Sequence, residues 1–254
     1  MNYKNIQAYQ YKNGSTNPIT EKLIKEELLR VYINNIHIEN ILTVEEDIEL
    51  LAIGNYYHCM NIAPDTILNN ISLSDKATNI TIESLNLGDK SYKRNCSCSS
   101  DLKADNKNEF RLNCFEIILY PNIIFKIKCN FEEMSRLFKE TAGVHSASIF
   151  DENGDNLGFF IDIARHNCLS KATGYLIKNN DQIKDKNLCI MISSRVNSEI
   201  VKMFDKLGVS TLITKAAPSY DSVIESEKRN ITLIGFLKED RFTVFSGIQR
   251  VITR

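Results

Sequence analysis

VHSASIFDENGDNLGFFIDIARHNCLSKATGYLI, at residues 144 to 177, decides the fold of this chain. The two β-like runs that flank the turn DENGDN predict a hairpin, and NCLSKATGYLI predicts the helix after it. The chain continues with the strand LCIMIS, the helix VNSEIVKMFDKL that ends at Gly208, the strand STLIT, a further helix and the strand ITLIGF. A hairpin followed by alternating strands and helices predicts an α/β sheet with helices on its faces.

The residues that precede this pattern predict a smaller, β-rich α+β domain. LLRVYIN and IHIENIL, within residues 28 to 42, have the composition of two strands joined at Asn34-Asn35, and NITIESL at 79 to 85 alternates like another strand. Thr43 and Glu46 form a capping box, which predicts that an amphipathic helix starts there.

We expect three segments along the chain. Residues 1–20 are polar and form a loose N-terminal segment, residues 21–129 form the N-terminal α+β domain, and residues 130–254 form the α/β domain. Asn130 and Glu133 are expected to cap the first helix of the α/β domain.

Composition places the chain among globular proteins that can bury a sizeable core, since 43% of its 254 residues are hydrophobic and 25% are charged. Its 31 Lys and Arg residues balance 32 Asp and Glu residues, so no overall field favours binding to nucleic acid or to a membrane surface. No stretch approaches the ~20 apolar residues of a membrane span, and the N-terminus lacks the apolar run of an export signal. We therefore expect a cytoplasmic protein whose seven cysteines are reduced thiols.

One segment of the N-terminal domain loses all periodicity. Residues 86–109 are rich in Lys, Asn, Asp and Ser, and structureless loops of this length in compact domains are usually functional or disordered. The stretch RNCSCSSDL at 94–102 places Cys96 and Cys98 in this polar surrounding, where thiols serve reactivity more often than packing. The two cysteines lack a second C-x-x-C or H-x-x-x-H pair, so we expect no metal site within one chain, and a site assembled between subunits is the remaining alternative.

The predicted strand ends carry the candidate binding residues. Ligands of open α/β sheets bind outside the carboxyl ends of the strands. Each of four such ends supplies a cation, and three of them add small or hydroxyl residues that open a helix, where free backbone N–H groups favour anions. The residues are Arg165, His166 and Asn167 after FFIDI, Ser193, Ser194 and Arg195 after LCIMI, Lys215 after STLIT, and Phe236, Leu237, Lys238, Glu239, Asp240 and Arg241 after ITLIG.

Each of these residues also has a simpler interpretation. A single arginine after a strand is most often a solvated loop residue, and His166 alone could be a satisfied surface histidine. The occurrence of a cation at all four strand ends favours a site for a phosphate-bearing ligand.

Several motifs carry a resemblance to a known family. KETAGVHSASIF, IDIARHNCLSKATG, SSRVNSEIVKMF, TKAAPSYDS and ITLIGFLKEDRFTVFS resemble, in this order and spacing, the FdhD family of formate dehydrogenase accessory sulfurtransferases. The resemblance starts near Leu29 and is most specific at Arg165-His166-Asn167 and Ala217-Pro218. It implies a cytidine-deaminase-like three-layer domain preceded by the smaller domain, and a homodimer.

The resemblance also implies a function. A family member takes sulfur as a persulfide from a cysteine desulfurase and transfers it to the molybdenum (or tungsten) bis-guanine-dinucleotide cofactor that formate dehydrogenase needs. The strand-end residues would bind this cofactor, and GDP would mimic it.

The family's reactive cysteine lies in the pattern Ser-Cys-Gly-x-Cys-Gly. A gap-free alignment puts Cys98 on its first cysteine and Asp101 on its second, whereas a one-residue gap lets Cys96 and Cys98 take both places. Ser97, Ser99 or Ser100 replaces the glycines in either case. We expect Cys98 to carry the persulfide and Cys96 to be the alternative.

Two other functions compete with sulfur transfer. A nucleotide deaminase is disfavoured, because Ala147 stands where the catalytic Glu of H-x-E should be and no P-C-x-x-C follows. A binding chaperone that holds the cofactor without carrying sulfur would make Cys96 and Cys98 incidental.

Overall fold

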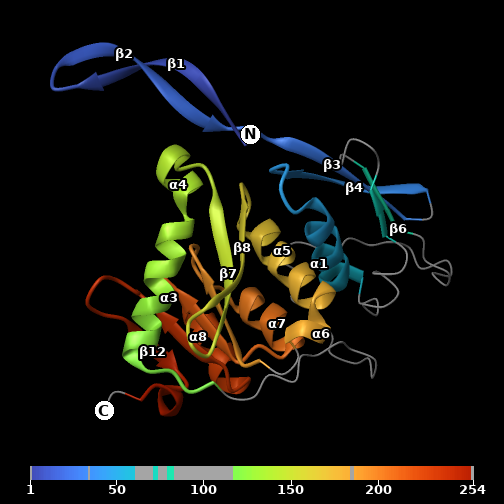
Figure 1. Ribbon diagram of the computed structural model, residues 1–254, viewed down its shortest axis with the longest axis vertical. Coiled ribbons are helices and arrows are strands. Elements are labelled where there is room, and N and C mark those ends of the chain that lie inside the picture. The colour runs from blue at the N-terminus through green and yellow to red at the C-terminus, as the bar shows by residue number, and fades with distance from the viewer. Residues whose placement is uncertain are drawn as a thin grey trace.

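A six-stranded sheet forms the centre of the computed structural model (Figure 1). The structure describes residues 2–33, 35–60, 71–73, 79–82, 117–183 and 186–252. The strand order is β12-β11-β10-β9-β7-β8. Its members are β7 (His145–Asp151), β8 (Asn156–Asp162), β9 (Leu188–Ile192), β10 (Thr211–Thr214), β11 (Thr232–Gly235) and β12 (Thr243–Ser246). The predicted hairpin is confirmed as β7 and β8.

Strand directions in this sheet are mixed. β9, β10 and β11 are parallel to one another, whereas β7 is antiparallel to both of its neighbours, β8 and β9. β12 runs antiparallel to β11 at the edge. The strands β8, β9, β10 and β11 therefore point the same way.

Helices cover both faces of the sheet, as the alternation predicts. α3 (Pro121–Met134), continued by α4 (Arg136–Thr141), lies on one face (Figure 1). The other face carries α5 (Arg165–Lys178), α7 (Ser198–Leu207) and α8 (Tyr220–Lys228). Short helical turns complete this part at α6 (Asn180–Ile183) and η1 (Ile248–Arg250). The mixed α/β class is confirmed.

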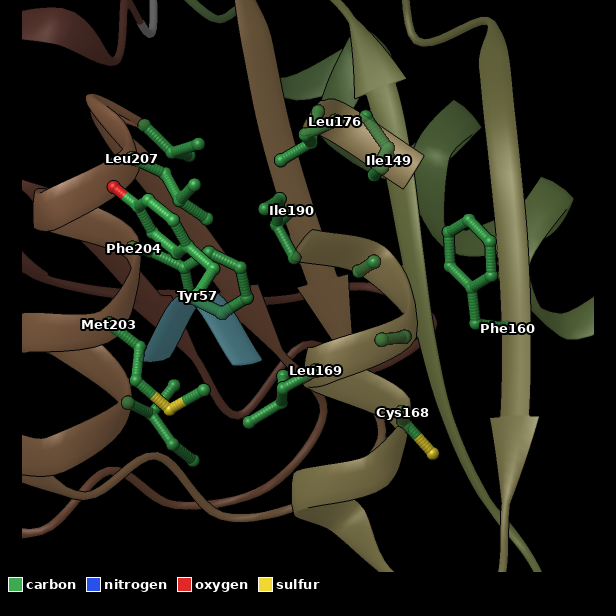
Figure 2. Packing of buried hydrophobic residues seen from close by; sticks show 14 of the residues in the cluster. Tyr57, Ile149, Phe160, Cys168, Leu169, Leu176, Ile190, Met203, Phe204 and Leu207 are labelled. Atoms are coloured by element: carbon green, nitrogen blue, oxygen red, sulfur yellow. The ribbon is translucent and has the colours of Figure 1, made fainter. Parts of the chain in front are cut away.

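The central strand β9 shows why both faces need helices. Ile190 packs with Leu176 of α5 and Phe204 of α7 in one core (Figure 2), whereas Cys189 and Met191 pack in the second core beneath α3. A strand that is apolar at every position must be covered on both sides, because its side chains alternate between the two faces.

A second, four-stranded sheet precedes this region. Its order is β4-β3-β6-β5, formed by β3 (Glu27–Ile33), β4 (Ile36–Thr43), β5 (Ile71–Leu73) and β6 (Asn79–Ile82). The prediction of a hairpin between β3 and β4 is confirmed, and Asn35 takes the left-handed backbone conformation that its turn requires, with φ at 64°.

The helix α1 (Ile48–Met60) joins the two parts of the molecule by packing on α5. Their backbones approach closely at two glycines: a Cβ atom on Gly54 would lie 1.8 Å from the carbonyl oxygen of Ser170, and one on Gly174 would lie 2.0 Å from that of Leu50. The crossing therefore has room only for glycine at these positions.

The N-terminal residues differ from the expectation of a loose segment. β1 (Tyr3–Lys12) and β2 (Ser15–Ile24) pair along their whole length as a hairpin that projects beyond α4 (Figure 1). Asn13 and Gly14 both have positive φ, 52° and 80°, which is the backbone that a two-residue hairpin turn needs. Polar side chains concealed the pattern, because both faces of the hairpin meet solvent.

Two expected helix starts are also corrected. Thr43 does not cap α1: it ends β4, and its hydroxyl donates to Asp162 Oδ2 at 2.5 Å. Asn130 does not cap the first helix of the α/β domain, because α3 begins at Pro121 and contains it. Proline at the first helical turn, which lacks an N–H to satisfy, is the signal that marks this start. The expected boundary at residues 129 and 130 thus falls inside α3.

Candidate functional site

The four predicted strand ends lie along one edge of the sheet, which we call the strand-end edge. β8, β9, β10 and β11 all finish there because they point the same way. β7 runs in the opposite direction, so its first residue, His145, joins the same edge between β8 and β9. The chain order of the hairpin could have indicated this residue, which the reading of strand ends missed.

α5 presents an open N-terminus at this edge. Its N-cap is Ala164, which has no side-chain cap, whereas Asn197 caps α7 and Ser219 caps α8 through their side chains. The first backbone N–H groups of α5 therefore lack a side-chain acceptor, and such groups favour an anion.

Arg165 is the first residue of this helix and lies near His145. Burial lowers the pKa of His145 below its usual value, and the positive charge of Arg165 contributes a smaller lowering. A lowered pKa keeps the imidazole neutral, so Arg165 is the cation at this end of the edge.

His166 brings an unsatisfied polar atom to the edge. Its Nε2 is buried and makes no hydrogen bond among the described residues, although Glu199 Oε2 of α7 lies 3.5 Å away. The His166 side chain as a whole is 41% exposed. A buried ring nitrogen without a partner is available to a ligand group.

Asn167 instead belongs to a buried network. Its side-chain amide donates to Asp162 Oδ1 at 2.9 Å and to the carbonyl oxygen of Leu42 at 2.8 Å. Asp162 is fully buried, pairs with Lys171 at 2.8 Å and accepts a hydrogen bond from Thr43. This network ties β4, β8 and α5 together at Asn167, the residue that follows Arg165 and His166 on α5.

The end of β9 offers a free cation and two engaged hydroxyls. Ser193 Oγ accepts the backbone N–H of Ser146 at 2.9 Å, and Ser194 is buried with its hydroxyl near the carbonyl oxygen of Arg195. Arg195 is exposed, and its guanidinium has no ion pair within the described part of the chain.

The end of β10 contributes a cation that is already paired. Lys215 Nζ lies 2.5 Å from Glu132 Oε1 of α3. Glu132 also accepts from Lys128 Nζ, which in turn bonds to Glu239 Oε1. We call Lys128, Glu132, Lys215 and Glu239 the charge cluster.

Residues 236 to 241 divide between core and surface. Leu237 is buried in the core beneath α3, so only its backbone can face a ligand. Phe236 is exposed and has a positive φ of 51°, which turns the chain at the end of β11. Lys238, Asp240 and Arg241 are exposed, and the backbone N–H of Lys238 donates to the carbonyl oxygen of Arg241 at 2.8 Å.

The predicted carrier thiols, Cys96 and Cys98, lie outside the described residues. Among the described thiols, Cys168 and Cys189 are buried, and burial raises their pKa far above its usual value, which suppresses the thiolate. Cys129 on α3 is exposed.

The described ranges contain neither a candidate metal site nor a helix that could cross a membrane. They contain no group of three or more His, Cys, Asp or Glu side chains placed to hold a metal ion. Every helix in them is too short or too polar to span a membrane.

The fold and the edge indicate a class: a mixed α/β protein whose strand ends combine two arginines that form no ion pair among the described residues with an open helix N-terminus. The FdhD/NarQ family profile matches residues 24–252, and the chain belongs to this family, as its motifs predicted.

Two relatives are named sulfur carrier protein FdhD. The protein from Picrophilus torridus is 30% identical over 247 residues, which cover 92% of this chain and 93% of the relative. The protein from Staphylococcus aureus (strain Newman) is 28% identical over 255 residues, 96% of this chain and 94% of the relative.

A solved structure shares the fold. The crystal structure of a protein from Desulfotalea psychrophila, described as a formate dehydrogenase accessory protein, superposes with a TM-score of 0.76 over 98% of this chain and 99% of its own. The two sequences are 16% identical, so this likeness concerns the fold alone.

Proposed function

We propose that this protein is a sulfur carrier that takes persulfide sulfur from a cysteine desulfurase. It transfers this sulfur to the molybdenum (or tungsten) bis-guanine-dinucleotide cofactor of formate dehydrogenase. Membership of the FdhD/NarQ family and the names of the two relatives support the carrier role. The three-layer arrangement of helices and sheet supports a cytidine-deaminase-like domain, which by family resemblance would act as a homodimer in the cytoplasm.

The observation that carries the proposal is the chemistry of the strand-end edge. Arg165 and Arg195 supply cations at the ends of β8 and β9, which lie on either side of β7, and the open N-terminus of α5 supplies backbone donors at the same edge. Phosphate oxygens accept both kinds of donor, and an arginine fork can bind two of them at once. The residues present therefore fit the diphosphate groups of a guanine dinucleotide, which is a substrate in this proposal.

Sulfur uptake requires a reachable thiolate. The thiolate attacks the outer sulfur of the donor's persulfide, a new S–S bond forms, and the desulfurase cysteine leaves as a thiolate. Cys168 and Cys189 are excluded as carriers because they are buried and their pKa is raised. The sequence around Cys98 and Cys96 is polar, which favours thiols that a donor can reach. Cys98 is therefore the proposed carrier, and Cys96 is the alternative.

Mass spectrometry of variants in which one cysteine is replaced by serine tests this proposal. After incubation with a cysteine desulfurase and cysteine, the parent should gain the mass of one sulfur atom on the peptide that contains Cys96 and Cys98. Cys98→Ser should abolish the transfer, and Cys96→Ser should retain part of it. Cys129→Ser is the matched control, because it removes an exposed thiol that the proposal does not use.

The variants also separate the alternatives. A reversed ranking of Cys98→Ser and Cys96→Ser would make Cys96 the carrier, as the gapped alignment implies. Full sulfur transfer by the Cys96→Ser/Cys98→Ser double variant would overturn the persulfide mechanism. A parent that binds GDP but never gains sulfur would be a cofactor-binding chaperone.

A further inference from the structure

Lys128 on α3 is a buried cation beside the strand-end edge that neither the sequence motifs nor the strand ends indicated. Its side chain is 6% exposed, and its ammonium group bonds to Glu132 Oε2 at 2.9 Å and to Glu239 Oε1 at 3.2 Å. A buried ammonium group is tolerated only when opposite charges compensate it. Here the compensation comes from two elements, α3 itself and the turn after β11.

The two carboxylates are held very differently. Glu132 is 28% exposed and bonds to both Lys128 and Lys215, so it is fixed from two sides. The Glu239 side chain is 85% exposed, and Lys128 is its one ion-pair partner within the described ranges. An exposed carboxylate with a single ion-pair contact separates readily from its partner, because hydration by water compensates the loss of that contact.

Separation of Glu239 changes the charge balance of the cluster. With Glu239 in contact, two ammonium groups face two carboxylates. Without it, Lys128 and Lys215 share the single carboxylate of Glu132, and one positive charge is left unbalanced. This charge lies beside the end of β10 and the turn 236–241, on the same edge as Arg195.

We propose that Lys128 is a further phosphate-binding residue, and that Glu239 occupies its place until a phosphate displaces the carboxylate. The inference rests on the proposed function, because the ligand would be a phosphate of the same guanine nucleotide. A phosphate carries more charge and more acceptor oxygens than the carboxylate, so the exchange favours the nucleotide. Glu239 loses little on release because its side chain already lies in solvent.

Titration of the full chain with GDP tests the exchange. Glu239→Gln removes the competing charge, so GDP should bind about two- to fivefold more tightly, the range expected for one exposed ion pair. Lys128→Met should weaken binding about tenfold or more through loss of a charged donor, and Lys128→Arg should retain most of it. Glu133→Gln is the matched control: it makes the same substitution at an exposed carboxylate of α3 that has no partner among the described residues and is not a candidate ligand-binding residue.

The outcomes distinguish this inference from the proposed function. Equal tightening by Glu239→Gln and Glu133→Gln would reduce the effect to general electrostatics and overturn the displacement of Glu239. If Lys128→Met did not fold, the comparison of Glu239→Gln with Glu133→Gln would decide alone, since both residues are exposed. Arg195→Ala tests the strand-end edge itself. If this variant bound GDP more weakly while the variants at Lys128 and Glu239 bound GDP like the parent, only the inference would be overturned. No GDP binding by the parent would overturn both.

Discussion

Asp162 and Lys171 form a fully buried ion pair whose surroundings explain why it is tolerated. Thr43, Asn167 and the backbone N–H of Ala164 donate to the Asp162 carboxylate, and Lys171 donates to the carbonyl oxygen of Ile161 at 2.9 Å. The remaining lone pairs and protons are thus used, which is the condition under which a buried pair survives its desolvation.

Lys171→Met should destabilise the protein by roughly 3–5 kcal/mol, because it leaves the Asp162 carboxylate buried without a counter-charge. Urea unfolding measures this change. Lys178→Met on the same helix is the control: it breaks the exposed Lys178–Glu49 pair and should change stability by less than about 1 kcal/mol. Adding Asp162→Asn to Lys171→Met should recover part of the loss, and a double variant less stable than Lys171→Met would contradict the argument.

The sequence predicted the cations of the edge better than it predicted the use of its polar residues. Arg165 and Arg195 were recognisable because parallel strands must end together. Asn167 and Ser193 instead bond to Leu42 and Ser146, and these partners are brought near only by the tertiary fold. No pattern of spacing within one element could have found these partners.

At the scale of elements, the crossing of α1 over α5 decides how the smaller sheet is attached. Gly54 and Gly174 face each other's helices, and a methyl group at either position would meet backbone rather than a movable side chain. A glycine inside a helix normally costs about 1 kcal/mol relative to alanine, so close packing must compensate for it.

Gly174→Ala should therefore destabilise the protein, although alanine is the better helix former. The added Cβ would lie 2.0 Å from the carbonyl oxygen of Leu50, so α1 must shift, and overpacking of this kind costs roughly 1–3 kcal/mol. Chemical denaturation with circular dichroism measures the change. A variant as stable as the parent, or more stable, would show that the helices do not approach as described.

Other elements show what sequence patterns reveal and what they conceal. The strands β9, β10 and β11 were predictable because each is a short apolar run, and α7 was predictable because it has an apolar helical period and ends at Gly208. The hairpin of β1 and β2 was not predictable from the sequence, since neither of its faces is buried in a core. A polar segment without an apolar period predicts a loose chain. The sequence pattern places the start of α3 too late, because the repeat of Phe131 and Met134 lies in the last turns of the helix.

At the scale of the whole molecule, His58 links the stability of the fold to pH. It lies on α1, its Nε2 is 2.8 Å from Thr173 Oγ1 of α5, and Lys206 of α7 is close by. Burial lowers the pKa of His58 from its ordinary 6.5 to about 3, with a smaller contribution from the positive charge of Lys206. The folded protein therefore keeps this ring neutral at acidities where the unfolded chain protonates it.

The free energy of unfolding should fall as the pH is lowered from about 6.5 towards 3, because the unfolded state alone binds the proton in this window. The slope should reach at most about 1.4 kcal/mol per pH unit, the value for one proton. Above pH 6.5 the contribution of His58 is fully present and constant. Urea titrations of the parent and of His58→Gln measure the difference, and identical slopes below pH 6 would remove His58 as the cause.

The bridge between Leu119 and Val251 has a consequence for how the protein is made. Leu119 donates its backbone N–H to the carbonyl oxygen of Arg250 and accepts from Ile252, and both Leu119 and Val251 belong to the core beneath α3. The strands β8 to β12 can pair nearly in the order in which a ribosome releases them, but the segment that leads into α3 has to wait for residues 250–252. Until translation has passed that point, the face of the sheet that α3 covers lacks its last partners, and the nascent chain is exposed to misfolding and to chaperones there.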